Sequence, residues 1–160
     1  MAKLVLHLRR LPRSEPEPAN HVVDLADQAC EEPTPTPLAR WSASVATAHD
    51  PCLVLDLHGR VLALSVAAAA LLGCCDVGVI GRPLLSVVDV VDFDTGRSGP
   101  DYAPRVAPLA VLAEGTGLVR SLLRVRQRDG SARTLDASAS PLHDVHGALI
   151  GSVTFLSVLG

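Results

Sequence analysis

The last third of the chain limits the possible folds more than any other part of the sequence. Apolar and polar residues alternate over residues 119–128, as in a β-strand with one buried face. The dipeptide Asp129-Gly130 follows, which is typical of a tight hairpin turn, and residues 132–140 alternate again. After a second turn, residues 148–158 form a third apolar run. We therefore predict a three-stranded antiparallel meander, whose middle strand ends at Pro141 because proline donates no ladder hydrogen bond.

The segment before the meander combines short strands with short helices. Residues 52–56 and 60–64 are apolar runs joined by a turn at Gly59, which can adopt a positive φ. Helices are expected at residues 38–48, 66–72, 83–91 and 106–114. Hairpin strands at both ends with helices between them predict an α+β fold, in which about five antiparallel strands form one sheet and short helices cover one face.

The first 37 residues differ in composition from the rest of the chain. Prolines alternate with charged residues over 12–18, and residues 33–37 read Pro-Thr-Pro-Thr-Pro, a spacer typical of polyproline II structure. Between them, residues 20–32 have an apolar side at helical spacing. We predict an N-terminal extension with a short helix and proline-rich spacers at residues 1–37, followed by one domain at residues 38–160.

Composition argues against several classes of protein. Aromatic residues make up 2% of the chain, so the core must be built from Leu, Val and Ala. The net charge is −3 and Lys3 is the only lysine, which argues against direct nucleic-acid binding. The N-terminal apolar stretch is too short for a signal peptide, and no apolar run is long enough to span a membrane. We expect a cytoplasmic protein that does not bind membranes.

Cysteine and histidine spacing gives little sign of chemistry. The four cysteines have no CxxC or metal-finger spacing, so free thiols are expected, with a strained vicinal disulfide at Cys74 and Cys75 as the alternative. His143 and His146 flank Asp144 and have the chemistry of metal ligands, but these residues equally suit an exposed hairpin turn. We predict no metal site and no catalytic residues, because no nucleophile, base and metal cluster occur together.

The order of the elements, together with several short motifs, resembles the PAS domain over residues 38–159. The motifs include Ile80-Gly-Arg-Pro-Leu84 and Arg128-Asp-Gly-Ser131. The full set of matching stretches is residues 50–62, 67–73, 80–84, 128–131, 137–142 and 146–153. The resemblance implies a five-stranded antiparallel sheet, flanked by helices around an apolar pocket. It also implies a sensory or protein-interaction role in signalling or transcriptional regulation.

The chain departs from this family at three places. Many members carry asparagine where this chain has Ser65. Photoactive flavin members have a reactive cysteine shortly after the glycine that corresponds to Gly81, and residues 82–86 contain none. Haem-binding members use a histidine on the helix before the meander, and residues 106–114 contain none. The resemblance therefore disfavours cysteinyl-flavin photochemistry and histidine-ligated haem, and it names no other cofactor.

An aliphatic pocket is expected beneath the helices, on the face of the sheet that carries Val119, Leu123 and Val125. We predict that its lining residues are Leu55, Leu71, Leu84, Leu109, Leu112, Leu123, Ala137 and Phe155. Such walls suit a lipid-like or small apolar ligand better than a flavin or a haem, because they offer little for stacking. The alternative is a core filled by its own side chains.

The opposite face of the sheet is the expected partner surface. Arg120, Arg124 and Arg126 lie along it with Asp136 on the next strand, which suits either an acidic partner or cross-strand ion pairs. The family resemblance implies that an N-terminal helix and a second subunit pack on this face. Trp41, in the helix at 38–48, is an amphipathic residue suited to anchor an interface.

Two functions follow from these expectations. The first is a ligand-sensing module that signals by changing its partner surface, as a homodimer or with a separate output protein. The second is a ligand-free module that dimerises or docks onto such a protein. Neither requires catalysis.

Overall fold

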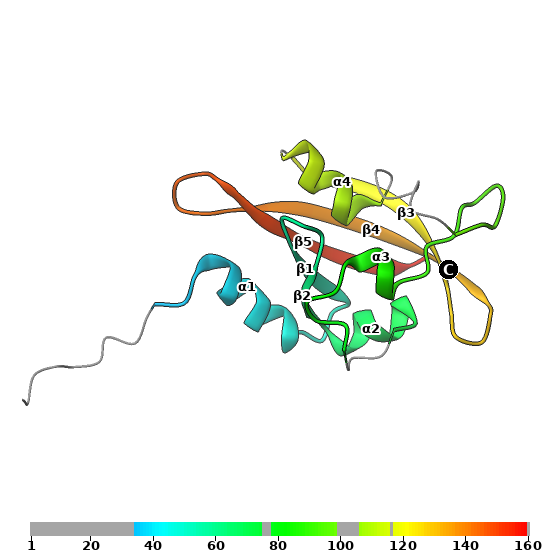
Figure 1. Ribbon diagram of the computed structural model, residues 1–160. Coiled ribbons are helices and arrows are strands. Elements are labelled where there is room, and N and C mark those ends of the chain that lie inside the picture. Colours follow the sequence, from blue (N-terminus) through cyan, green and yellow to red (C-terminus); the bar gives the residue numbers. More distant parts are fainter. Residues whose placement is uncertain (1–33, 75–77, 99–105, 116, 160) are drawn as a thin grey trace, which may run out of the picture. The chain divides into compact units, whose positions relative to one another are not determined.

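The computed structural model describes residues 34–74, 78–98, 106–115 and 117–159 (Figure 1). The chain separates into two units, Met1–Pro33 and Thr34–Gly160, so the boundary expected at residue 37 stays a prediction. The expected helix at 20–32, the spacer at 12–18 and the thiol of Cys75 lie outside the described residues. None of the helices in the described segments is both long and apolar enough to cross a membrane.

A single five-stranded antiparallel sheet organises the domain, as the sequence predicted. The strands are β1 (Cys52–Asp56), β2 (Val61–Leu64), β3 (Val119–Arg126), β4 (Ala132–His143) and β5 (Leu149–Val158). Their order across the sheet is β2-β1-β5-β4-β3, so β5 is the central strand and joins the first hairpin to the meander. The helices are α1 (Pro37–Ala46), α2 (Val66–Leu72), α3 (Leu84–Val87) and α4 (Ala107–Glu114).

The expected end of the middle meander strand at Pro141 is wrong. β4 continues to His143, and Pro141 lies opposite Ser152 of β5. The last residue pair between β3 and β4 joins Val119 to Ala139, so β4 has only one neighbour beyond that point. Pro141 therefore lies in an edge segment, where a proline is tolerated without loss of a ladder hydrogen bond.

The helix expected at residues 83–91 is shorter than predicted. α3 contains only residues 84–87, and the chain after it is extended and lies along β3. The amide of Val91 donates to the carbonyl of Arg124 at 2.7 Å, and the amide of Arg126 donates to the carbonyl of Asp89 at 2.9 Å. Backbone groups at the edge of β3 thus compete with helical bonds for this segment.

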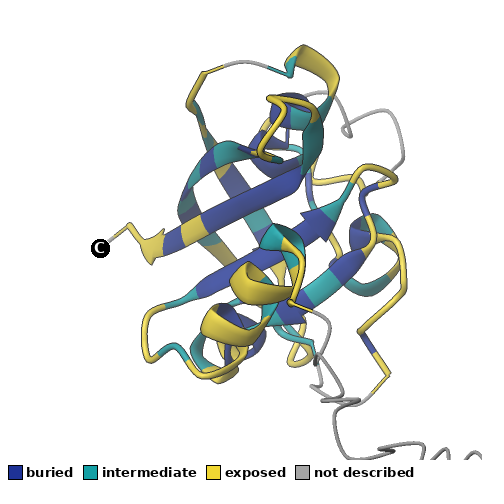
Figure 2. Cartoon of the chain, turned by 90° about the vertical axis from the view of Figure 1, so that its left-hand side faces the viewer, coloured by how far each residue is buried: buried dark blue, intermediate teal, exposed yellow. Residues whose placement is uncertain are grey.

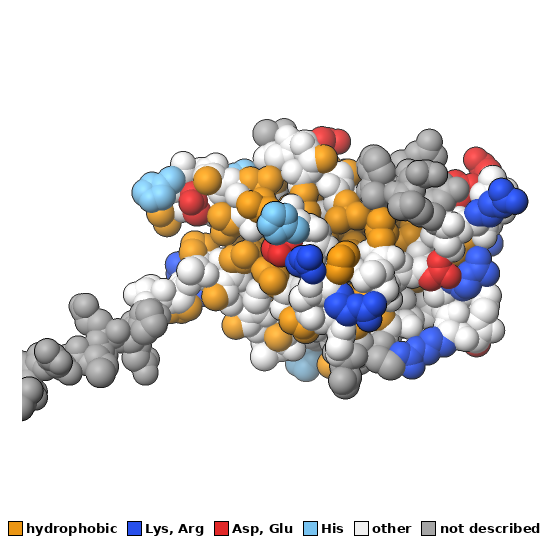
Figure 3. All heavy atoms as spheres, in the orientation of Figure 1, with side chains coloured by type: hydrophobic (Ala, Val, Ile, Leu, Met, Phe, Trp, Pro, Cys, Tyr) orange, Lys and Arg blue, Asp and Glu red, His pale blue; other side chains and the backbone are white. Residues whose placement is uncertain are grey.

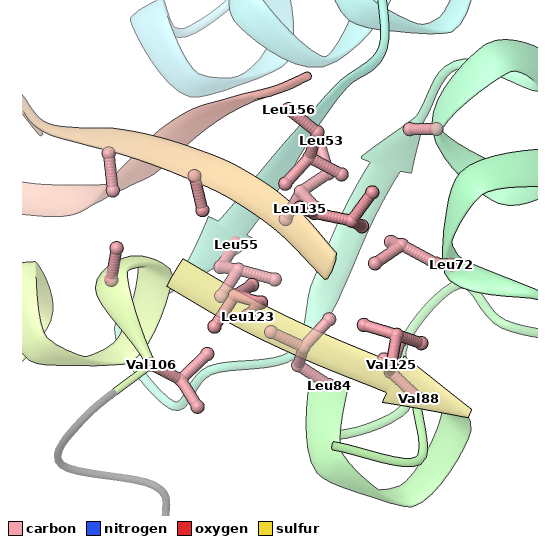
Figure 4. Close-up of a cluster of buried hydrophobic side chains, with 14 of the residues drawn as sticks. Leu53, Leu55, Leu72, Leu84, Val88, Val106, Leu123, Val125, Leu135 and Leu156 are labelled. Atoms are coloured by element: carbon pink, nitrogen blue, oxygen red, sulfur yellow. The ribbon is translucent and has the colours of Figure 1, made fainter. Parts of the chain in front are cut away.

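Two hydrophobic clusters lie on opposite faces of the sheet. The inner cluster joins the sheet to α2, α3 and α4 (Figure 4), and the outer cluster joins β1, β2 and β5 to Leu38 and Val45 of α1. Figure 2 shows the buried residues gathered along the strands, with exposed residues on the turns and on the outward sides of the helices. One face thus carries three short helices, as expected, and α1 packs on the other.

Ser65 connects α2 to the first hairpin. Its hydroxyl accepts hydrogen bonds from the amides of Ala68 and Cys52, both at 3.1 Å, and donates to the carbonyl of Asp50 at 2.9 Å. The first of these bonds caps the N-terminus of α2. Ser65 is fully buried, so these bonds satisfy its own hydroxyl and the amides of Cys52 and Ala68 where water cannot reach them.

Replacing Ser65 with alanine should lower the free energy of unfolding by about 2–4 kcal/mol, because the helix cap is lost and the buried amide of Cys52 loses one partner. Urea denaturation followed by circular dichroism measures the change. Ser44→Ala is the matched control, since the hydroxyl of Ser44 bonds to the carbonyl of Arg40 on the exposed side of α1. Equal stabilities for the two variants would contradict the role given to Ser65.

Candidate functional site

The inner cluster contains most of the residues predicted to line a pocket. Leu55, Leu84, Leu123 and Ala137 are buried members, and Leu71, Leu109 and Leu112 are partly buried and pack against it. In Figure 4 the labelled leucines and valines of the sheet point toward those of α2, α3 and the segment before α4. Every described member is Leu, Val, Ala or Cys, so the cluster is aliphatic apart from one thiol. Whether these residues bind a ligand stays a prediction.

Phe155 does not belong to this group, and its assignment to the pocket is wrong. It pairs with Ser138 of β4 and with Cys52 of β1, and its side chain is 49% exposed on the outer face. The inner cluster contains its neighbour Leu156 instead. Residues 151–154 of β5 are buried on both faces of the sheet, so polarity does not alternate along this strand and its register could not be assigned from the pattern.

Three hydroxyl groups of the sheet lie on the inner face, toward α4. The hydroxyl of Ser121 accepts from the amide of Ala107 at 3.0 Å, and the hydroxyl of Ser152 donates to the carbonyl of Pro108 at 3.1 Å. These two bonds attach the first turn of α4 to the sheet. Thr154 is fully buried on the same face, and its hydroxyl has no hydrogen-bond partner among the described residues. Sequence reasoning did not identify Thr154, since a threonine in a strand is ordinary.

The open outer face is the part of the sheet that α1 leaves uncovered, and it consists of Arg120, Leu122, Asp136, Ser138 and Phe155. Arg120, Ser138 and Phe155 are cross-strand neighbours in one row, and Leu122 and Asp136 belong to the next row. Arg120 reaches across to form a bidentate ion pair with Asp136, whose Oδ1 lies 2.9 Å from Nε of Arg120. This geometry supports the interpretation as a cross-strand ion pair for Arg120.

The ion pair determines the protonation of the carboxyl group at the centre of the open outer face. The Asp136 side chain is only 11% exposed, whereas that of Arg120 is 69% exposed. The hydrogen bond and the positive charge of Arg120 hold the pKa of Asp136 below its ordinary value, and Asp136 in turn raises the pKa of Arg120. The carboxylate therefore stays charged at neutral pH.

The other two predicted arginines lie in different surroundings. Nε of Arg126 lies 3.1 Å from Oδ2 of Asp89, and its guanidinium also donates to the carbonyl of Gly96 at 3.1 Å. Arg126 therefore binds the segment that covers the edge of β3. Arg124 is half-buried and lines a small cleft beside Phe93 and Leu122. The structure thus does not gather the three arginines into one continuous stripe.

Trp41 lies on α1, the helix that packs on the outer face of the sheet. On α1, Leu38 and Val45 point into the outer cluster, and Ser42 and Ala46 line a groove against β2. Helical spacing puts Trp41 on the other flank of α1, where it lines a shallow hollow with Pro37, Arg40 and Ser44. Its side chain is 42% exposed. Exposed aromatic rings thus occur on α1 and β5, on the same side of the sheet.

His58 and His146 lie in turns, and His143 is the last residue of β4. The carboxylate of Asp144 accepts from the amides of His146 and Ala148 at 2.8 and 2.9 Å, which fixes the turn between β4 and β5. Figure 3 shows histidine and acidic side chains at the tip of this hairpin, on the left. Asp56 holds the turn at His58 in the same way. Within the described segments, no three His, Cys, Asp or Glu side chains are placed to hold a metal ion.

Comparisons with known proteins agree with this geometry. A family model for the PAS fold matches residues 45–159. No curated protein sequence matches the chain. The structure is similar to a PAS domain from Colwellia psychrerythraea, with a TM-score of 0.55 and 14% identity over 76% of this chain and 96% of that one.

Two further solved structures show the same likeness of fold. The light state of the blue-light photoreceptor Aureochrome1 LOV has a TM-score of 0.55 and 15% identity, over 73% of this chain and 87% of that one. The VqmA dimer of Vibrio cholerae, described as a LuxR-type receptor, has a TM-score of 0.50 and 17% identity, over 76% of this chain and 52% of that one.

Replacing Arg120 with alanine should raise the pKa of Asp136 toward its ordinary value, which carbon NMR of the carboxyl group measures as a function of pH. Because the folded pKa of Asp136 lies below the unfolded one, the pair contributes stability above the unfolded pKa and loses it as pH falls through the folded pKa. This acid-dependent loss should diminish in the variant. The pKa of Asp129, lowered mainly by Ser131, serves as the internal control and should not change. An Asp136 that titrates identically in both proteins would contradict the pairing.

Proposed function

Since the chain belongs to the PAS family, we propose that it acts as a cytoplasmic sensory module that regulates another protein in signalling or transcriptional control. Sensory and signalling roles are the common property of this family. We propose a non-catalytic role, in which binding at one face changes what the other face contacts. The observation that carries this proposal is the arrangement of the central strand, which has an aliphatic cluster on one side and an open outer face on the other.

The input we propose is a small apolar ligand bound within the inner cluster. The described members of that cluster include no aromatic side chain, so it offers no ring for stacking against a flavin or a haem. α4 contributes Ala107, Ala110 and Val111 as its buried apolar contacts, together with Pro108. Aliphatic walls of this kind favour an aliphatic ligand.

The output we propose is a protein contact on the open outer face, made by a second copy of this chain or by a separate output protein. Phe155 and Leu122 are about half exposed there, and Trp41 is exposed on α1, which packs on the same side of the sheet. Large apolar side chains beside a charged pair resemble the centre of an interface and its polar surroundings. The similar structure of VqmA is described as a dimer, which supports this choice.

A ligand-free docking or dimerisation module is the second candidate. It is favoured by the dense packing of the inner cluster, in which residues such as Leu55, Leu135 and Val125 are fully buried by one another. Under this alternative the open outer face alone carries the function, and the inner cluster only stabilises the fold.

Native mass spectrometry of the purified chain, compared with the denatured mass, separates the two candidates. A sensory module is expected to carry a noncovalent small molecule, seen as an additional mass that disappears on denaturation. A stable dimer of bare chains that takes up no apolar compound would contradict the sensory proposal and favour the docking module.

Replacing Phe155 or Trp41 with alanine should weaken self-association by more than about tenfold, because aromatic anchors contribute most of the energy of such interfaces. Light scattering over a range of concentrations measures the dissociation constant. Leu57→Ala is the matched control, since Leu57 is equally exposed but lies in the turn between β1 and β2. A dimer of the wild-type chain that is unchanged in both aromatic variants would contradict the proposed interface.

A further inference from the structure

We propose that the hydroxyl of Thr154 binds the polar group of a small, otherwise aliphatic ligand, between the first turn of α4 and the inner face of β5. This inference rests on the proposed sensory function and specifies the chemistry of its ligand: a compact hydrocarbon body with a single hydroxyl or carbonyl group.

The first observation is the unpaired hydroxyl itself. Thr154 is fully buried, and its Oγ1 has no hydrogen-bond partner among the described residues. The other two buried polar side chains among the described residues, Ser65 and Ser152, both have partners. A buried polar group without a partner destabilises the fold, whereas a residue of the same shape without the hydroxyl does not. The hydroxyl of Thr154 therefore does not stabilise the folded domain.

The second observation is the position of Thr154 relative to α4. On the inner face, side chains lie in successive rows that run across the strands. Ser152 and Leu55 belong to one row, and Thr154 belongs to the next. Leu156 and Ser121 belong to the row after that. Ser152 binds the carbonyl of Pro108, and Ser121 binds the amide of Ala107. Thr154 thus belongs to the row between the two serines that hold the first turn of the helix.

The surroundings determine what this hydroxyl can bind. The cross-strand neighbours of Thr154 are Leu53 and Ala139, and Leu156 follows it on the same face. A water molecule needs two or more polar partners in a buried site, and these three side chains supply none. The nearest polar side chain on this face is Ser152, whose hydroxyl proton is already donated to the carbonyl of Pro108. A ligand with an apolar body and one polar group satisfies Thr154 and contacts the aliphatic neighbours at the same time.

Binding at this position displaces the first turn of α4. The turn is attached to the sheet by the two serine hydrogen bonds and by the buried side chains of Ala107, Pro108 and Ala110. Small side chains bury little apolar area, so less stabilisation is lost when this turn moves than when a leucine-rich helix moves. The ligand therefore takes the space beneath the turn, and the position of α4 reports whether it is bound.

The test uses the full chain with two probes of matched shape, cyclohexanol and cyclohexane. Amide chemical shifts in NMR titrations locate each probe and give its dissociation constant.

Thr154→Val removes the hydroxyl while keeping the shape, and it should fold at least as stably as the wild type. Thr154→Ser keeps the hydroxyl. Thr134→Val makes the same chemical change on the other face of β4, where Thr134 lies opposite Arg124, and serves as the control.

We expect cyclohexanol to shift the amides of α4 and of residues near Thr154, and to bind about fivefold more weakly to Thr154→Val, the effect of one net hydrogen bond. Thr154→Ser and Thr134→Val should bind it as the wild type does, and cyclohexane should not distinguish any of the four proteins. Equal affinity of cyclohexanol for wild type and Thr154→Val, with shifts at the inner face, would overturn the role of Thr154 and leave the proposed ligand site standing. If neither probe shifts an inner-face amide, both the inference and the proposed ligand site are wrong.

Discussion

The pairing of β5 with both β1 and β4 is the constraint on which the rest of the structure depends. Residues 151–155 pair with all five residues of β1, and the whole strand pairs with β4. Without β5 the first hairpin and the meander would be separate pieces of sheet. The fit is close: a Cβ atom at Gly151 would lie 2.3 Å from the carbonyl oxygen of Leu55, so only glycine allows the two strands to approach here.

Because β5 is central, its two faces belong to different parts of the molecule. Thr154 points into the inner cluster beneath α4, and the next residue, Phe155, points to the open outer face. The proposed ligand contact and the proposed partner contact are therefore made by consecutive residues of one strand. A shift of β5 along its neighbours would move both together, since the peptide that joins them is held by strands on each side.

The parts of the fold that depend on local patterns were predictable from the sequence. The alternation over 119–128 identified the buried face of β3 correctly, and Asp129-Gly130 identified its hairpin. The helix at 66–72 and its end at Gly73, which has a φ of 68°, also follow from local rules. The extended segment after α3 was not predictable, because it is held by the edge of β3, more than thirty residues later in the chain.

The same distinction between local pattern and tertiary contact applies to the candidate site. By itself the sequence determined the family resemblance, an aliphatic inner cluster and a sheet face on which arginines lie near Asp136, since each follows from residue type and strand alternation. Only the tertiary structure decided that Phe155 lies outside, that Arg126 binds a loop, and that the hydroxyl of Thr154 is buried without a partner. The physical reason is that each of these outcomes depends on contacts with residues distant in the chain, and the alternation of polar and apolar residues along one strand does not specify those contacts.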